Sequence, residues 1–200
     1  MADADEEQDS QVLESSIPTI TDDEKIFLCA VHKGSESQLK KLLDAKGSMV
    51  NTKSAVKGLT GLHIAAGKGD VACTKLLIEA NARVDAADSM KMLPLHFAAD
   101  CKSSEVTSLL LATEKAKAAI DAQDEDGSTA LHHAAYAGRV DVTKALLAAG
   151  ASKDISDAKG KTALEEAKER DHAEVVAAFE GEPAADTGGD EAQDGAAATN

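Results

Sequence analysis

Three histidines recur along the chain at nearly equal spacing: His63, His96 and His132. Imidazole nitrogens bind metal ions, transfer protons in catalysis, or bond to buried backbone groups. The steps from 63 to 96 (33 residues) and from 96 to 132 (36 residues) put one histidine in each structural unit, so the three rings cannot converge on one ion. On a helix the ring of His133 points away from that of His132, which argues against a two-histidine chelate. We therefore expect structural histidines and no metal site.

Motifs that carry catalysis are missing from the sequence. It contains no glycine-rich phosphate loop and no G-x-S-x-G nucleophile motif. Carboxylate pairs are plentiful, but they fall in the chain ends and in turns, where no apolar pocket would shift their pKa values. We expect no catalytic residue, no cofactor and no enzymatic activity.

The net charge of −15 is concentrated at the two ends of the chain. Residues 1–24 hold nine acids and residues 180–200 hold six, with no Lys or Arg in either segment, which leaves 21 acids and 21 bases in residues 25–179. The neutral middle argues against direct nucleic-acid binding, because phosphate contacts need positive charge. We predict disordered acidic tails at 1–21 and 181–200. These tails either keep the chain soluble or compete with nucleic acid for a basic patch on a partner.

The three cysteines do not suggest a disulfide framework. Cys29 and Cys73 fall at apolar helix positions, Cys101 falls at a helix end where we expect exposure, and no C-x-x-C occurs. No secretory leader is apparent, and no stretch approaches the ~20 apolar residues of a membrane span. We expect a cytoplasmic or nuclear protein without a membrane partner.

A seven-residue motif places the histidines on repeated helices. It reads TGLHIAA at 60–66, LPLHFAA at 93–99, TALHHAA at 129–135 and TALEEAK at 162–168. A pair of large aliphatic residues follows the first three copies at a matching offset, at 77–78, 110–111 and 146–147. Periods near 33 residues are typical of stacked repeats. The motif, its period and the aliphatic pair together resemble the ankyrin-repeat family.

The resemblance implies an all-α ankyrin-repeat solenoid of about five helix-turn-helix repeats with β-turn or hairpin connections. It covers residues 22–180, in units of about 22–52, 53–87, 88–123, 124–156 and 157–180. The first and last units have polar faces that suit caps, and Thr21 and Glu24 are spaced as a capping box. In the family, the motif histidine bonds to the backbone of the adjacent turn and ties repeats together.

The third unit departs most from this pattern. Lys91 and Lys102 stand where the other units have glycine, and such turns tend to need a positive φ. Three extra residues lengthen the segment 113–119, whose sequence TEKAKAA favours helix. We expect the second helix of this unit to run on by about one turn.

Family members contact their partners through the finger-like turns and the ends of the first helices, which line a concave face. Those positions hold Val56, Lys57, Leu59, Lys68, Met90, Met92, Asp100, Cys101, Glu125, Asp126, Ser128, Tyr136, Lys159, Lys161 and Arg170. Apolar side chains such as Met90 and Tyr136 are unusual at such solvated positions and indicate a partner surface. Alternatively, Leu59 and the two methionines fold back into irregular turns. The lysines among these positions would form a weakly basic rim that could accept an acidic segment or hold the chain's own acidic tail.

The resemblance implies an intracellular protein–protein interaction module, either an adaptor or a regulatory or inhibitory subunit. We expect a monomer that binds another protein, and the family admits kinase inhibitors, proteasome-assembly chaperones, transcription-factor inhibitors and adaptors. One alternative resembles the NF-kappa-B inhibitors, whose acidic tail would occlude a basic DNA-binding surface. An enzyme or a nucleic-acid binder is the alternative of another class.

Overall fold

The structure, a computed structural model of the chain, describes residues 21–181. The acidic segments at 1–20 and 182–200, which the sequence predicts to be disordered, lie outside the described residues. Within 21–181, no helix is long and apolar enough to cross a membrane.

The described helices form five consecutive pairs, in agreement with the predicted all-α solenoid. The pairs are α2 (Asp22–Lys33) with α3 (Glu36–Ala45), α4 (Gly61–Lys68) with α5 (Val71–Glu79), α6 (Pro94–Asp100) with α7 (Ser104–Leu111), α9 (Ala130–Tyr136) with α10 (Val140–Ala148), and α11 (Ala163–Glu169) with α12 (Ala173–Glu180). A 3-10 helix, η1 (Gly47–Asn51), follows the first pair, and a short helix, α8 (Glu114–Ala118), follows the third.

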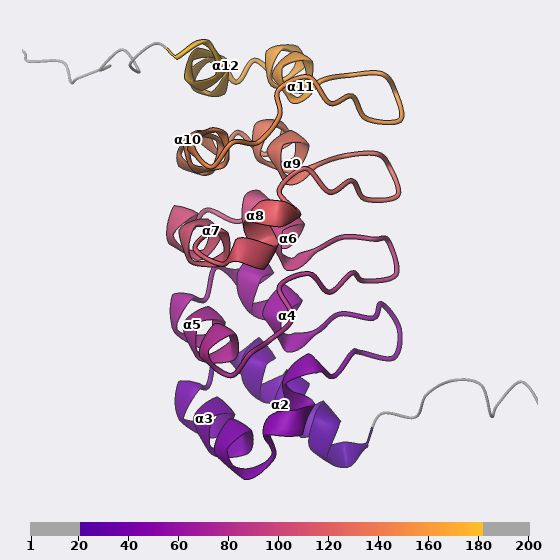
Figure 1. Cartoon of the computed structure of the whole chain (residues 1–200), viewed down its shortest axis with the longest axis vertical. Helices are drawn as coiled ribbons and strands as arrows, with labels where there is room; N and C mark the ends of the chain where they lie inside the picture. Colours follow the sequence, from indigo (N-terminus) through magenta and orange to yellow (C-terminus); the bar gives the residue numbers. More distant parts are fainter. Residues whose placement is uncertain (1–20, 182–200) are drawn as a thin grey trace, which may run out of the picture.

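The pairs stack into a column with three layers (Figure 1). The inner helices α2, α4, α6, α9 and α11 lie in the middle, with α3, α5, α7, α10 and α12 on one side. On the opposite side, four fingers project between the pairs (Figure 1). We define the fingers as residues 54–59, 88–92, 124–128 and 157–161, each closed by backbone hydrogen bonds. The fingers and the adjoining sides of the inner helices form the concave face.

Local sequence sets where the first helices begin and end. The capping box predicted for α2 is confirmed, because Glu24 accepts a 2.8 Å bond from the Thr21 N–H while Thr21 accepts from the Glu24 N–H. Asp70 caps α5 through the N–H of Cys73 at 2.9 Å. Gly34 and Gly69 end α2 and α4 in the left-handed conformation, with φ of 67° and 68°.

Small side chains let the inner helices stack closely. Ala65, Ala98 and Ala134 are fully buried between successive inner helices, each beside a leucine of the recurrent motif. The outer helices contribute a matching row, in which Leu77, Leu110 and Leu146 are fully buried. Burial of an aliphatic side chain stabilises a fold by about 1.5–3 kcal/mol, so each repeat depends on its neighbours for a core.

Backbone hydrogen bonds also join one finger to the next. The N–H of Ser89 donates to Lys57 O at 3.0 Å, that of Glu125 to Met90 O at 3.0 Å, and that of Ala158 to Asp126 O at 2.8 Å. Each bond crosses from one repeat to the following one. The fingers are therefore fixed relative to one another and to the helices behind them.

In the third repeat, Lys91 and Lys102 replace two glycines of the other repeats, and the backbone differs at the two positions. Lys91 has a φ of 59°, as expected from its alignment with Gly127 and Gly160. Lys102 does not take a positive φ, so the corresponding prediction is wrong. Helix α6 ends at Asp100, four residues after its motif histidine, as α9 ends at Tyr136. The next residue differs, because Cys101 is extended with φ −78° and ψ 166°, whereas Ala137 after α9 is helical with φ −83° and ψ −2°. The extended Cys101 rebuilds the turn without a left-handed residue.

Two further predictions for this repeat need correction. Cys101 is 8% exposed rather than solvated, because the extended backbone turns its thiol inward to bond to Ala98 O at 3.1 Å. The segment 113–119 does not prolong α7. Instead Thr113 caps a separate helix, α8, by accepting from the N–H of Ala116 at 3.3 Å, and Ala116 is buried.

The left-handed backbone at Lys91 predicts a stabilising substitution. Lys91→Gly should raise the free energy of unfolding by about 0.5–1 kcal/mol, since only a residue with a Cβ is strained at this φ. Urea denaturation measures this change. Lys102→Gly is the matched control and should lower stability by up to about 1 kcal/mol. Its backbone is not strained, so the glycine only increases the conformational entropy of the unfolded chain. Equal effects from the two substitutions would contradict the assignment of strain to Lys91.

Candidate functional site

Each motif histidine bonds to its own repeat through Nδ1 and to the next repeat through Nε2. Nδ1 accepts the backbone N–H at the start of its own helix, for example that of Thr60 to His63 at 3.1 Å. Nε2 donates to a carbonyl of the following finger region. These bonds are His63 to Met92 O at 3.1 Å, His96 to Ala122 O at 3.0 Å and His132 to Lys161 O at 3.1 Å. This arrangement confirms the structural role that the resemblance implies.

An accepting Nδ1 requires a neutral ring, and the electrostatics agree. Burial lowers the pKa of His63 and of His96, because the charged imidazolium loses its hydration inside the stack. The Nε2–H tautomer is fixed by the carbonyl that it faces. Within residues 21–181, no three His, Cys, Asp or Glu side chains are grouped so as to hold a metal ion.

An aspartate at the base of three fingers was missed by the sequence analysis. Asp88, Asp124 and Asp157 each accept two backbone N–H groups of their own finger, at 2.8–2.9 Å. Each stands eight residues before the motif histidine or its replacement, as in the step from 124 to 132. That regular offset is the signal that would have found them.

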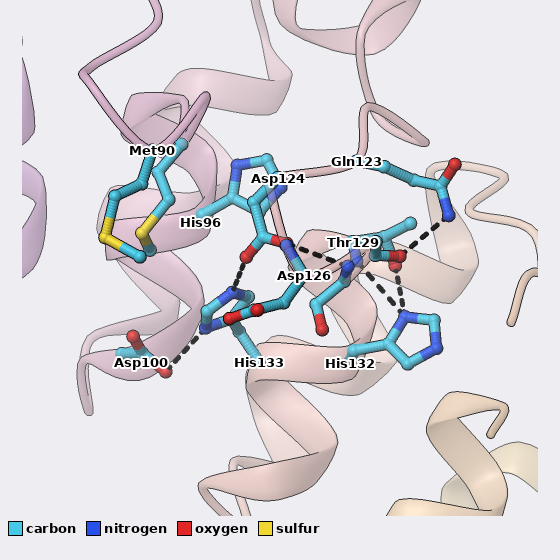
Figure 2. Close-up of polar contacts among 12 residues, drawn as sticks. Met90, His96, Asp100, Gln123, Asp124, Asp126, Thr129, His132 and His133 are labelled. Carbon is cyan, nitrogen blue, oxygen red and sulfur yellow. Dashed lines mark hydrogen bonds and ion pairs between the residues drawn. The ribbon is translucent and has the colours of Figure 1, made fainter. Parts of the chain in front are cut away.

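His133 is the residue with the most unusual surroundings on the concave face (Figure 2). Its Nε2 lies 2.9 Å from Asp124 Oδ2, and its Nδ1 lies 3.3 Å from Asp100 Oδ1. Because carboxylates face both nitrogens, both must carry a proton to satisfy these contacts, which makes the ring a cation. His133 is thus charged where the adjacent His132 is neutral.

The electrostatic balance at His133 favours the ion pairs over desolvation. Burial alone would lower the pKa of His133, but the hydrogen bonds to Asp100 and Asp124 outweigh it and raise that pKa. Burial would raise the pKa of Asp124, yet the bonds from His133 and from the Ser128 N–H lower it. The ring also packs edge-on against His96, with centroids 5.5 Å apart, and joins α9 to α6 across the repeat boundary.

A depression of about 410 Å³ opens beside this cluster, between the last two fingers. Five carboxylates line it: Asp100, Asp124, Asp126, Asp157 and Glu166. The wall also contains the aromatic ring of Tyr136 and two basic side chains, His133 and Lys159. The site therefore combines negative charge with one large aromatic side chain.

The ring of Tyr136 makes a cation–π contact with Arg170 of the same chain. The guanidinium carbon of Arg170 lies 3.2 Å from the ring centroid, and Arg170 Nε donates to Glu166 at 3.1 Å. Such stacking is worth about 0.5–1 kcal/mol at an exposed site. It holds the phenol in place while leaving 51% of Tyr136 exposed.

Most of the predicted binding positions are accessible, and the structure brings only some of them together. Exposed residues are Val56, Lys57, Lys68, Met90, Asp100, Glu125, Asp126, Tyr136, Lys159 and Arg170, whereas Leu59, Met92, Ser128 and Lys161 are half-buried and Cys101 is buried. Asp100, Asp126, Ser128, Tyr136 and Lys159 share the depression.

The half-buried apolar residues behave as the alternative interpretation expected. Leu59 and Met92 lie partly inside their fingers, whereas Met90 is 48% exposed. The predicted basic rim is only partly free, since Lys161 pairs with Glu169 and Lys68 bonds to His32 O. The exposed part of the predicted surface is therefore smaller than the full set of family positions.

Sequence comparison agrees with this architecture. The family model for ankyrin repeats (three copies) matches residues 26–121 and 114–182. The chain belongs to the ankyrin-repeat family. No curated protein matched the chain significantly. Ankyrin repeats generally serve as protein–protein interaction modules.

The charged state of His133 predicts a pH-dependent contribution to stability. A histidine whose folded pKa is raised stabilises the fold below its unfolded pKa, and this stabilisation is lost as the pH rises through the folded pKa. His133→Gln should therefore cost more at pH 6 than at pH 8.5, by on the order of 1 kcal/mol, the scale of one charge-assisted hydrogen bond. Asp124 stays ionised across this window because its pKa is lowered.

Urea denaturation of both proteins at the two pH values measures this difference. His32→Gln, which changes an exposed histidine of α2, is the control and should show no such pH dependence. A cost of His133→Gln that is equal at both pH values would contradict a protonated ring in the folded protein.

Proposed function

We propose that this ankyrin-repeat protein binds a partner protein through its concave face, as an adaptor or a regulatory subunit without catalytic activity. The observation that carries the proposal is the pair of exposed side chains Met90 and Tyr136 on neighbouring repeats. Methionine adapts to varied shapes and tyrosine is a frequent anchor of interfaces. Tyr136 lines a polar depression that offers hydrogen-bonding groups, and Met90 stands on the preceding finger, whose Met90 O accepts the N–H of Glu125.

Rigidity of the surface supports this function. Met90 O accepts the N–H of Glu125, so the finger that presents Met90 is bonded to the finger of the next repeat. Tyr136 ends helix α9, and its own carbonyl accepts a bond from His172 Nε2 at 3.1 Å. A surface that is already ordered loses little conformational entropy when it binds. This favours recognition of a partner by preformed geometry.

An inhibitor of a DNA-binding protein is the second candidate, favoured by the fifteen acids in residues 1–24 and 180–200. Such a segment would cover a basic surface of the partner and exclude nucleic acid from it. Binding that weakens steeply with salt, and that is lost on deletion of 1–15 and 183–200, would support this role. Binding that survives the deletion would leave the concave face as the principal contact. Either role fits an intracellular protein, which we also propose.

Removal of the two exposed side chains tests the proposed function. Met90→Ala/Tyr136→Ala should weaken partner binding by at least about 2 kcal/mol, because large anchors dominate interfaces. The measurement is affinity capture from the source cells with quantitative mass spectrometry, followed by titration of the captured partner. The circular dichroism spectrum should stay unchanged, since neither side chain is in the core.

Ile26→Ala provides the matched control, because Ile26 is an exposed apolar residue of α2 in the first repeat. It should leave capture unchanged. Full capture by the Met90/Tyr136 variant would show that the partner uses another face of the stack.

A further inference from the structure

We propose that the depression beside His133 receives a basic segment of the partner, in which a Lys or Arg side chain enters the depression while an adjacent apolar residue packs on Met90 and Tyr136. This inference rests on the proposed function and deepens it by naming the chemistry of the partner.

The first support is the charge of the depression. Five carboxylates line it, against the ammonium of Lys159 and the imidazolium of His133 when that ring is protonated. Net negative potential in a depression concentrates cations and raises their association rate. The described residues 21–181 hold 25 acids and 21 bases, and without the five carboxylates and Lys159 of this site they hold 20 of each. The negative charge is therefore a local feature of the site.

The second support is that some of these carboxylates are free to bind. Asp124 and Asp157 are occupied by the N–H groups of their own fingers, and Glu166 is paired with Arg170. Within residues 21–181, no cationic group lies within 4 Å of the Asp126 carboxylate. The Asp100 side chain is 49% exposed although it contacts His133. Asp100 and Asp126 are thus the two carboxylates that a partner can reach.

The third support is the way in which the chain binds one of its own cations at this site. Arg170 of the chain itself places a guanidinium on the ring of Tyr136, with Glu166 as its anion. The wall of the depression therefore already holds a cation by an aromatic face combined with a carboxylate. A guanidinium or ammonium from a partner would meet the same combination of groups, Tyr136 with Asp100 or Asp126.

An acidic or uncharged partner segment fits this site less well. An incoming carboxylate would face Asp100 and Asp126 at short range, and like-charge contacts at an interface are unfavourable. The apolar surface of Met90 and Tyr136 alone would not select against such a segment. The carboxylates therefore supply the specificity and the apolar side chains supply much of the affinity.

The test uses the full chain and a phage library of random dodecapeptides as the probe. Selected peptides should carry Lys or Arg next to a large apolar residue. Their affinity, measured by fluorescence anisotropy, should fall about tenfold for Asp100→Asn/Asp126→Asn. Glu105→Gln/Asp141→Asn, which removes two exposed carboxylates from the outer helices α7 and α10, should change it less than twofold. All variants keep the same acidic segments at 1–20 and 182–200, so peptides that bind those segments would respond equally to both pairs.

The outcomes separate this inference from the proposed function. Selection of acidic or uncharged peptides, of no peptide, or of peptides that respond equally to the two carboxylate pairs overturns the inference. If selected peptides lose affinity with Met90→Ala/Tyr136→Ala but not with Asp100→Asn/Asp126→Asn, the concave face still binds and only the basic character of the partner is wrong. Peptides that respond to neither concave variant contradict both proposals.

Discussion

The stack depends on a neutral imidazole that bonds to the start of its own helix and to a carbonyl of the next repeat. In each of three repeats the ring accepts the N–H that opens its own helix and donates to a carbonyl of the following finger region, as His96 does with Leu93 and Ala122. Losing the ring would leave the buried N–H that opens each helix without its acceptor, at about 1–3 kcal/mol. The carbonyls Met92 O and Lys161 O would keep the bonds from the Asp88 and Asp157 N–H groups. An ionised carboxylate could accept the N–H but could not donate to the carbonyl. The histidine spacing in the sequence is the consequence of this requirement.

The end repeats show what happens when that requirement is relaxed. Glu165 replaces the histidine in the last described repeat and accepts the N–H of Thr162 at 2.8 Å, and within residues 21–181 no later repeat offers it a carbonyl. Glu24 plays the same part in the first repeat and is reached by the Thr52 hydroxyl at 3.3 Å. At these two positions a side chain that accepts the N–H at the start of its own helix is sufficient, and no donor to the next repeat is needed. The polar faces that the sequence assigns to the caps follow from the same absence of a neighbour to pack on.

The repeat architecture could be predicted from the sequence because the same motif recurs in each repeat. The features that were not predicted depend on contacts between particular side chains. The positive φ of Lys91 follows from its place in the period. The turn at Lys102 does not, since it depends on how the Cys101 thiol reaches Ala98 O. Of the candidate site, the exposure of Met90 and Tyr136 was predicted. The ion pairs of His133 were not, because Asp100 lies 33 residues away and only the stacked repeats bring the two together.

The cluster around His133 connects the shape of the binding surface to the stability of the stack. Asp124 fixes its own finger with one oxygen and bonds to His133 with the other, so the position of the finger and the charge of the ring are coupled. Asp100 extends this coupling to the preceding repeat. A partner cation that pairs with Asp100 would compete with His133 for the same carboxylate and thereby lower the pKa of the ring. Binding at the depression would then favour loss of the proton from His133, and the interface between the third and fourth repeats would exchange an internal ion pair for an intermolecular one. The proposed binding surface and the contact that joins the repeats are thus built from the same side chains.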